Sequence, residues 1–191
     1  MKRLAILTPL VALATTLTCP GVVFAQSAAD EVLLQMQQAS RKQDLRTLTS
    51  LLPAIQDHPL EVWGHYWALK ARLSSATAQE VEDFLQRWRG TYQEDRLRND
   101  WLLLLGQRRD WAGFVAEYPR FRMRDDPQVR CYAAAADVAT GKPATREMAQ
   151  QVKRDWFGQR EVDDGCLLAV GLVHQAGALP FSDLWMRARL A

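Results

Sequence analysis

The carboxylates are the residues from which chemistry would be expected first. General acid catalysis needs a carboxyl group whose pKa is raised by an apolar pocket. The acidic residues stand instead mostly where helices are expected to begin. At a helix start a carboxylate accepts hydrogen bonds from free N–H groups, which lowers its pKa. We therefore interpret these residues as helix caps and predict no catalytic residue among them: Asp57, Asp110, Asp126, Asp163 and Asp164.

The sequence carries no other pattern for metal, cofactor or nucleophile chemistry. No two of the three histidines, His58, His65 and His174, have the i, i+4 spacing of a helical metal site, and Cys166 is eight positions before His174. A Gly-x-Ser-x-Gly elbow, a P-loop and a Gly-rich dinucleotide turn are all absent. We predict neither a metal nor a cofactor.

Arginines are concentrated between residues 87 and 124, where they outnumber the acidic residues. One interpretation is a cationic lining that contacts an anionic ligand or an acidic partner. The alternative, which we favour, is a solvated outer face carrying ion pairs. For the first interpretation the candidate contacts are Arg96, Arg98, Arg108 and Arg109.

The first 25 residues have the three-part layout of a secretory signal peptide. A basic start precedes the apolar run Leu4–Leu17, and small residues in Val23–Ala25 precede the predicted cleavage point. The apolar run is shorter than the ~20 residues of a membrane span. Cys19 raises a lipoprotein alternative, but its preceding leucine is one place too close for lipid attachment. We expect a signal peptide at 1–25 and an exported domain at 26–191.

The exported part has equal numbers of basic and acidic residues, which argues against a nucleic-acid binder. Its two cysteines, Cys131 and Cys166, lie 35 positions apart, about one helix hairpin of a helical repeat. An even number of cysteines in an exported chain favours a disulfide. Two buried thiols are the alternative.

The stretch Arg96–Phe121 predicts a helix, a tight turn and a second helix. Apolar residues recur at helical spacing in both halves, and Asp110 is placed to cap the second. We expect the first helix to run through Gly106 to Arg108, with Gly106 as a point of close approach. Neither helix can bury its apolar stripe alone, so the hairpin must stack on neighbours.

The same arrangement recurs along the chain, giving about ten helices with short links. Pro53 is expected to end or bend its helix, Thr77 begins a capping box, and Pro59 and Pro143 are expected at first helical positions. We predict an all-α fold, an open superhelix of stacked hairpins. The expected helices cover residues 28–40, 45–55, 59–73, 77–90, 96–108, 110–121, 127–140, 143–157, 166–173 and 180–190.

Two apolar sets remain open to interpretation. Tryptophans at helical spacing beside leucines are more often core than sugar-stacking platforms, and we assign them to the core: Trp63, Trp67, Trp88 and Trp101. In the last helix, Leu184, Trp185 and Leu190 point away from any predicted partner. Because solenoids end in atypical polar repeats, we expect the natural protein to continue.

The sequence resembles the N-terminal region of the soluble lytic murein transglycosylases. The resemblance rests on Arg96–Trp111, on Arg130-Cys131-Tyr132 with its Ala-rich continuation, on Asp163–Cys166, and on the order of the hairpins. It implies a periplasmic protein with a U-shaped helical superhelix, in which the two cysteines can form a disulfide. In the family this superhelix precedes a linker domain and a lysozyme-like domain that cleaves the glycan strands of peptidoglycan.

The sequence departs from the family in its catalytic part. The family's glutamate is followed by serine, whereas none of the eight glutamates here precedes a serine. We therefore predict a truncated or partial member, a non-catalytic scaffold that positions or restricts peptidoglycan. The alternative is a stand-alone exported adaptor that binds a protein partner. A reading frame continuing past Ala191 into a Glu-Ser domain would favour the first hypothesis.

Overall fold

The computed structural model describes residues 21–189. Residues 1–20 and 190–191, which include most of the predicted leader and Leu190, lie outside the described residues. Helix α1 begins at Gly21, ahead of the predicted start at Ala28 and of the predicted cleavage point. Within the described part, ten α-helices and three short 3-10 helices follow one another and no strand occurs, which confirms the all-α prediction.

The helices end close to where the local signals place them. They are α1 (Gly21–Arg41), α2 (Leu45–Leu51), α3 (Glu61–Ala71), α4 (Ala78–Arg87), α5 (Tyr92–Arg108), α6 (Trp111–Glu117), α7 (Pro127–Ala139), α8 (Arg146–Phe157), α9 (Asp164–Gln175) and α10 (Phe181–Ala188). The 3-10 helices cover Leu52–Ile55, Leu73–Ser75 and Tyr118–Arg120. The first of these contains Pro53, which ends α2 as expected.

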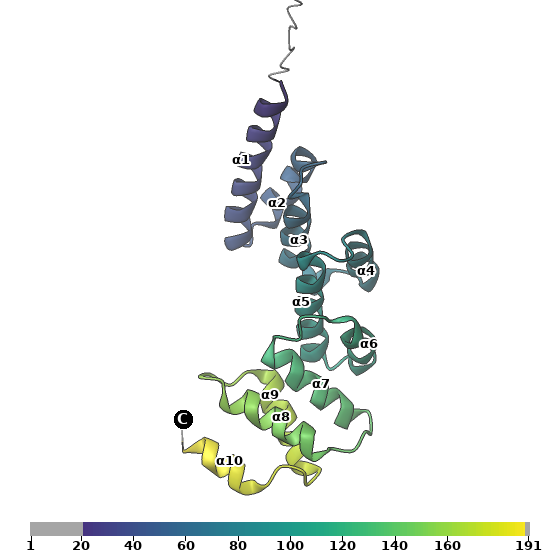
Figure 1. Ribbon diagram of the computed structural model, residues 1–191, viewed down its shortest axis with the longest axis vertical. Helices are drawn as coiled ribbons and strands as arrows, with labels where there is room; N and C mark the ends of the chain where they lie inside the picture. Colours follow the sequence, from purple (N-terminus) through teal and green to yellow (C-terminus); the bar gives the residue numbers. More distant parts are fainter. Residues whose placement is uncertain (1–20, 190–191) are drawn as a thin grey trace, which may run out of the picture.

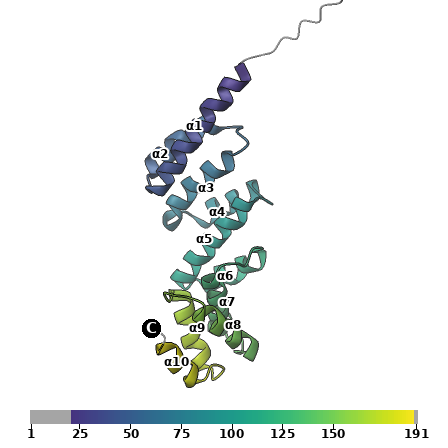
Figure 2. The same cartoon turned by 60° about the vertical axis from the view of Figure 1, so that its left-hand side comes forward.

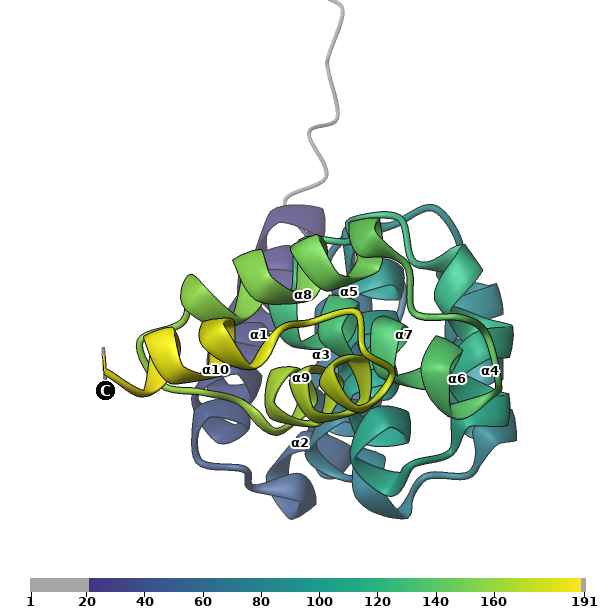
Figure 3. The same cartoon turned by 90° about the horizontal axis from the view of Figure 1, so that it is seen from below.

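The helices stack into an elongated superhelix (Figure 1, Figure 2). Successive odd-numbered helices pack on one another, α1 on α3, α3 on α5, α5 on α7 and α7 on α9. The even-numbered helices lie outside this column, and α4 and α6 lie together on one side of it in the view from below (Figure 3). This is the arrangement expected for stacked hairpins, each of which buries an apolar stripe against its neighbours.

Three connected hydrophobic clusters fill the column. One lies between α1 and α3, a second extends from α3 to α7, and the third joins α7, α8 and α9. Trp101 is buried, whereas Trp63, Trp67 and Trp88 are half-buried and pack against the cluster of α3 to α7. The tryptophans therefore belong largely to the core, as the helical spacing indicates.

Most of the predicted caps are present. Thr77 and Glu80 form the capping box of α4, and Asp110 and Asp126 cap α6 and α7. Helix α5 begins earlier than expected, at Tyr92, because the Thr91 hydroxyl caps it by accepting a hydrogen bond from the Glu94 N–H (3.1 Å). It runs through Gly106 to Arg108, as predicted.

Two helix starts predicted from prolines are wrong. Helix α3 begins at Glu61, not at Pro59, because the His58 ring accepts the Leu60 N–H (3.1 Å) and the Glu61 carboxylate accepts the Asp57 N–H (2.9 Å). Asp57 itself has a left-handed backbone (φ 62°) and caps nothing. Helix α8 begins at Arg146, not at Pro143, since Thr145 is its cap.

The last helix, α10, is joined to the rest through polar contacts and through Leu184, which packs against the cluster of α7, α8 and α9, contrary to its predicted exposure. The Lys153 ammonium lies 2.7 Å from Asp183, and the Arg187 guanidinium donates to the Gln159 carbonyl (2.7 Å). Trp185 is 59% exposed and Phe181 is 67% exposed. None of the helices between residues 21 and 189 is both long and apolar enough to cross a membrane.

The close contact between Gly106 of α5 and Tyr132 of α7 allows a prediction about stability. A Cβ at Gly106 would lie 2.4 Å from the Tyr132 ring, so Gly106→Ala forces the ring or the helix to move. We expect it to lower the free energy of unfolding by about 1–3 kcal/mol, the usual cost of overpacking. Urea unfolding followed by far-UV circular dichroism measures this.

A matched control lies on α9. Around Gly171 a Cβ would meet nothing within 4 Å, so Gly171→Ala should stabilise the protein by about 0.5–1 kcal/mol through helix propensity alone. Equal effects of the two substitutions would mean that the Gly106 contact is not tight.

Candidate functional site

The four candidate arginines of α5 lie at the two ends of the helix. Residues 96 and 109 are separated by about 20 Å along a helix of ordinary rise. Arg96 is half-buried beside Asp100 and Tyr66, which together outweigh burial and raise the pKa of its guanidinium. Arg98 is buried, with only 4% of its surface exposed.

Arg98 is held in a buried network of charged groups. Its guanidinium contacts the carboxylates of Glu94 and Glu117, which are themselves buried. Arg122 approaches Glu94 from the outside at 3.0 Å. Asp95, 2% exposed, accepts the backbone N–H groups of residues 122 and 123 (3.0 and 2.7 Å). The network joins α5 to α6 and to the segment after α6. Arg98 therefore has a structural role.

Arg108 and Arg109 are engaged at the other end of α5. The Arg108 guanidinium donates to the Ser74 carbonyl. Arg109 ends the helix in a left-handed conformation (φ 58°) and its guanidinium lies 2.9 Å from Asp164 at the start of α9. The hydrogen bond from Arg109, followed by one from Tyr132, lowers the pKa of Asp164. Burial and Asp164 together raise the pKa of Tyr132 to about 12.

The structure therefore does not bring the four arginines together as one lining. Other arginines of the same stretch are also paired, Arg87 with Glu61 and Arg120 with Glu82. This distribution favours the interpretation in which the arginines serve ion pairs of the scaffold. Contact of the four with an anionic ligand stays a prediction.

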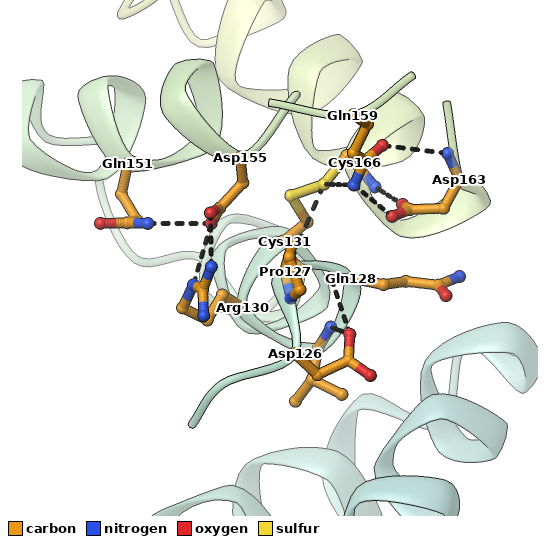
Figure 4. Close-up of a disulfide and its surroundings, with 11 residues drawn as sticks. Asp126, Pro127, Gln128, Arg130, Cys131, Gln151, Asp155, Gln159, Asp163 and Cys166 are labelled. Carbon is orange, nitrogen blue, oxygen red and sulfur yellow. Dashed lines mark hydrogen bonds and ion pairs between the residues drawn. A yellow bond between two sulfur atoms is a disulfide. The ribbon is translucent and has the colours of Figure 1, made fainter. Parts of the chain in front are cut away.

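The cysteines form the disulfide that the sequence favoured. Cys131 on α7 and Cys166 on α9 are both fully buried, and the bond joins the helix pair with the closest packing in the column (Figure 4). Beside the bond, the Arg130 guanidinium contacts Asp155 of α8 at 2.6 Å. The disulfide and this ion pair hold α7, α8 and α9 as one unit.

Most of the carboxylates at the helix starts act as caps. Asp163 caps α9 by accepting the Cys166 N–H at 2.7 Å. Because burial outweighs the hydrogen bonds that it accepts, the pKa of Asp163 is raised. The expectation of a lowered pKa is therefore wrong for Asp163, although it holds for Asp164. Asp163 faces the disulfide and Gln159 (Figure 4).

The histidines do not form a metal site. Within residues 28–189 no three histidine, cysteine or acidic side chains are grouped to hold an ion. His58 contacts Asp30 (2.9 Å) and His174 contacts the Leu179 carbonyl (2.8 Å). His65 makes no hydrogen bond to any residue that the structure describes. Burial, and then Arg87, lower the pKa of His65, which favours the neutral form of its imidazole.

Sequence reasoning missed the pocket into which His65 faces. This pocket, of about 310 Å³, lies where α2 and its 3-10 extension, α3 and α4 meet. Its apolar floor is formed by Leu52, Leu69 and Phe84, and Trp88 stands beside His65 with the ring centroids 5.8 Å apart. The sequence pattern that could have indicated this pocket is a histidine and two arginines that interrupt the apolar stripes of adjacent helices. This pocket is the candidate ligand site, because apolar pockets with a few convergent polar groups are where small molecules bind.

The fold and these contacts define an α-superhelix of stacked hairpins. No protein-family model and no curated protein matches the sequence. Two solved structures share the fold: the 70-kDa soluble lytic transglycosylase of Escherichia coli (TM-score 0.62) and the 70-kDa soluble lytic transglycosylase in complex with bulgecin A (TM-score 0.61). Each is 19% identical over 83% of this chain and 25% of that chain. The chain thus spans about a quarter of those proteins.

The disulfide gives a direct prediction. Closing a loop of this length restricts the unfolded chain, so the double substitution Cys131→Ser and Cys166→Ser should lower the free energy of unfolding by about 3–4 kcal/mol. Urea unfolding with and without reductant measures it. Reductant should weaken the parent protein and leave the double variant unchanged. Two alkylatable thiols in unreduced protein, detected by mass spectrometry, would disprove the bond.

The network around Arg98 predicts acid sensitivity. Although burial opposes it, hydrogen bonds from the Gly90 N–H and Arg98, with the charge of Arg122, lower the pKa of Glu94. A lowered folded-state pKa stabilises the protein above the ordinary pKa of 4.5, and this stabilisation disappears as pH falls through the folded value. Glu94→Gln should therefore lose about 1.5–3 kcal/mol at pH 7.

The difference between Glu94→Gln and the parent protein should shrink steadily below pH 4.5, as measured by urea unfolding at each pH. Glu82→Gln is the control, because the ion pair of Glu82 with Arg120 is exposed and its N–O distance is long, at 3.5 Å. It should change stability by no more than about 0.5 kcal/mol. A pH-independent loss for Glu94→Gln would show that its charge is not what stabilises the network.

Proposed function

We propose that this chain is a non-catalytic helical domain related to that of a soluble lytic transglycosylase, and that it positions or restricts peptidoglycan. The observation that carries the proposal is the common fold over 83% of the chain, at a TM-score of 0.61–0.62. In this proposal residues 1–25 are a signal peptide, residues 26–191 form part of the superhelix, and the protein acts in the periplasm.

The state of the carboxylates supports a non-catalytic role. Asp110 and Asp126 are engaged as helix caps, and Glu94, Asp95 and Glu117 are held by arginines and backbone N–H groups. Asp163, whose pKa is raised, is engaged by the Gln159 amide and the Cys166 N–H beside the buried disulfide. These carboxylates thus serve the scaffold.

A second candidate is a stand-alone exported adaptor, and exposed apolar surface favours it. On α1 and beside α3, Leu34 and Leu60 are 59% and 51% exposed and line a groove of about 230 Å³ with Trp63 and Trp67. Exposed apolar patches of this kind are typical of protein interaction sites. A protein partner would make this groove its interface.

The first proposal predicts binding to peptidoglycan without cleavage. Purified protein incubated with isolated sacculi should sediment with them, and the supernatant analysed by mass spectrometry should contain no anhydro-muropeptides. Release of such products would show that the chain itself carries the chemistry. If the protein neither sediments nor releases product, the scaffold role is wrong and the adaptor hypothesis is favoured.

A further inference from the structure

The pocket beside His65 has walls from three successive helices of the superhelix. Residues 65 and 69 of α3 and its C-cap, Arg72, line one wall, and residues 80, 84 and 87 of α4 line the other. Both sets recur at three- and four-residue spacing, so each lies on one face of its helix. The two faces meet over an apolar floor while their polar ends point into the opening.

Three of the four charged residues that line this pocket are paired within the protein. Arg72 on one wall contacts Glu80 on the other at 2.8 Å, and Arg87 contacts Glu61 at 3.3 Å. Asp83 has no cationic partner among the described residues. Since the remaining charge is not positive, the pocket offers no net attraction to an anion. A neutral ligand can bind through hydrogen bonds and leave these ion pairs intact.

Several polar groups of the pocket keep unused hydrogen-bonding capacity. The imidazole of His65 has one donor and one acceptor, neither of which is engaged by a described residue. Asp83 accepts one hydrogen bond, from Gln79 at 2.7 Å, and its other carboxylate oxygen is available. The Arg72 and Arg87 guanidiniums each have further N–H donors. These planar groups can each meet two neighbouring hydroxyls at once.

The pocket also has apolar surface that suits a sugar ring. Trp88 and Phe84 give aromatic surface, and the Arg87 guanidinium lies over the Trp88 ring at 4.7 Å, which keeps the ring in place. A pyranose has both kinds of surface, since its C–H groups form an apolar face and its hydroxyls surround it. The volume of about 310 Å³ is at the lower end of the range for small-ligand sites.

We propose that the pocket between α3 and α4 is a binding site for a neutral saccharide, with His65 and Asp83 as hydrogen-bonding residues and Trp88 as the apolar contact. The site extends the proposed function by giving the scaffold a glycan contact of its own. It rests on the pocket's residues, and its test is separate from the sedimentation with sacculi.

The experiment is a titration of the full chain with soluble sugars, followed by calorimetry and by NMR of the histidine and indole signals. The probes are chitotetraose and cellotetraose as neutral oligosaccharides and tetragalacturonate as an anionic one. We expect the neutral sugars to shift the His65 signal and to bind at least tenfold more tightly than the anionic one. His65→Ala should weaken binding about tenfold or more.

Control variants locate the site. Trp63→Ala changes the other aromatic groove, and His174→Ala removes a histidine at the far end of the superhelix, so both should bind as the parent does. Circular dichroism checks that each variant is folded, and His65→Gln, which keeps hydrogen-bonding groups, should retain more affinity than His65→Ala.

Three results would overturn the proposal: no binding of neutral sugars at 10 mM, tighter binding of tetragalacturonate, or loss of binding in Trp63→Ala with His65→Ala unaffected. If the chain sediments with sacculi but ignores the soluble sugars, this site is wrong and the scaffold proposal stands. If it binds the sugars and not sacculi, the site stands and the scaffold proposal fails.

Discussion

The close packing of α7 between α5 and α9 is the constraint on which the superhelix depends. Tyr132 of α7 lies with its ring against Gly106 of α5, at a distance that excludes any Cβ there, and close to Gly165 of α9. Its hydroxyl donates to Asp164 (2.6 Å), and the neighbouring residue, Cys131, is bonded to Cys166. One turn of α7 thus fixes both of its neighbours.

The same arrangement is weaker elsewhere in the column. Gly64 of α3 also allows close approach, but there the nearest atoms are the ends of the Met36 and Ile55 side chains, which can move. The rigid ring at Gly106 and the backbone of residue 128 at Gly165 cannot move so easily. The contacts that can adjust least therefore lie between α5, α7 and α9. This part also contains the disulfide and the Arg109–Asp164 pair.

Much of this fold could be predicted from the sequence because its signals are local. Helical spacing gives the ten helices, and Thr77, Asp110 and Asp126 cap helices through N–H groups two or three residues away. The errors at Pro59 and Pro143 have the same local origin. Proline suits a helix start, but the side chains of Glu61 and Thr145 supply the hydrogen bonds that decide where each helix begins.

The partners of the candidate arginines could not be predicted in this way, because they depend on contacts between distant residues. Arg109 and Asp164 are 55 positions apart, and the network of Arg98 joins α5 to residues beyond α6. Sequence shows an excess of arginine but not which carboxylates face it. Pairing within the scaffold changes the chemistry expected of the surface. Several arginines of this stretch are held by carboxylates or carbonyl groups of the scaffold, so an excess of arginine in the sequence does not by itself define an anion-binding surface.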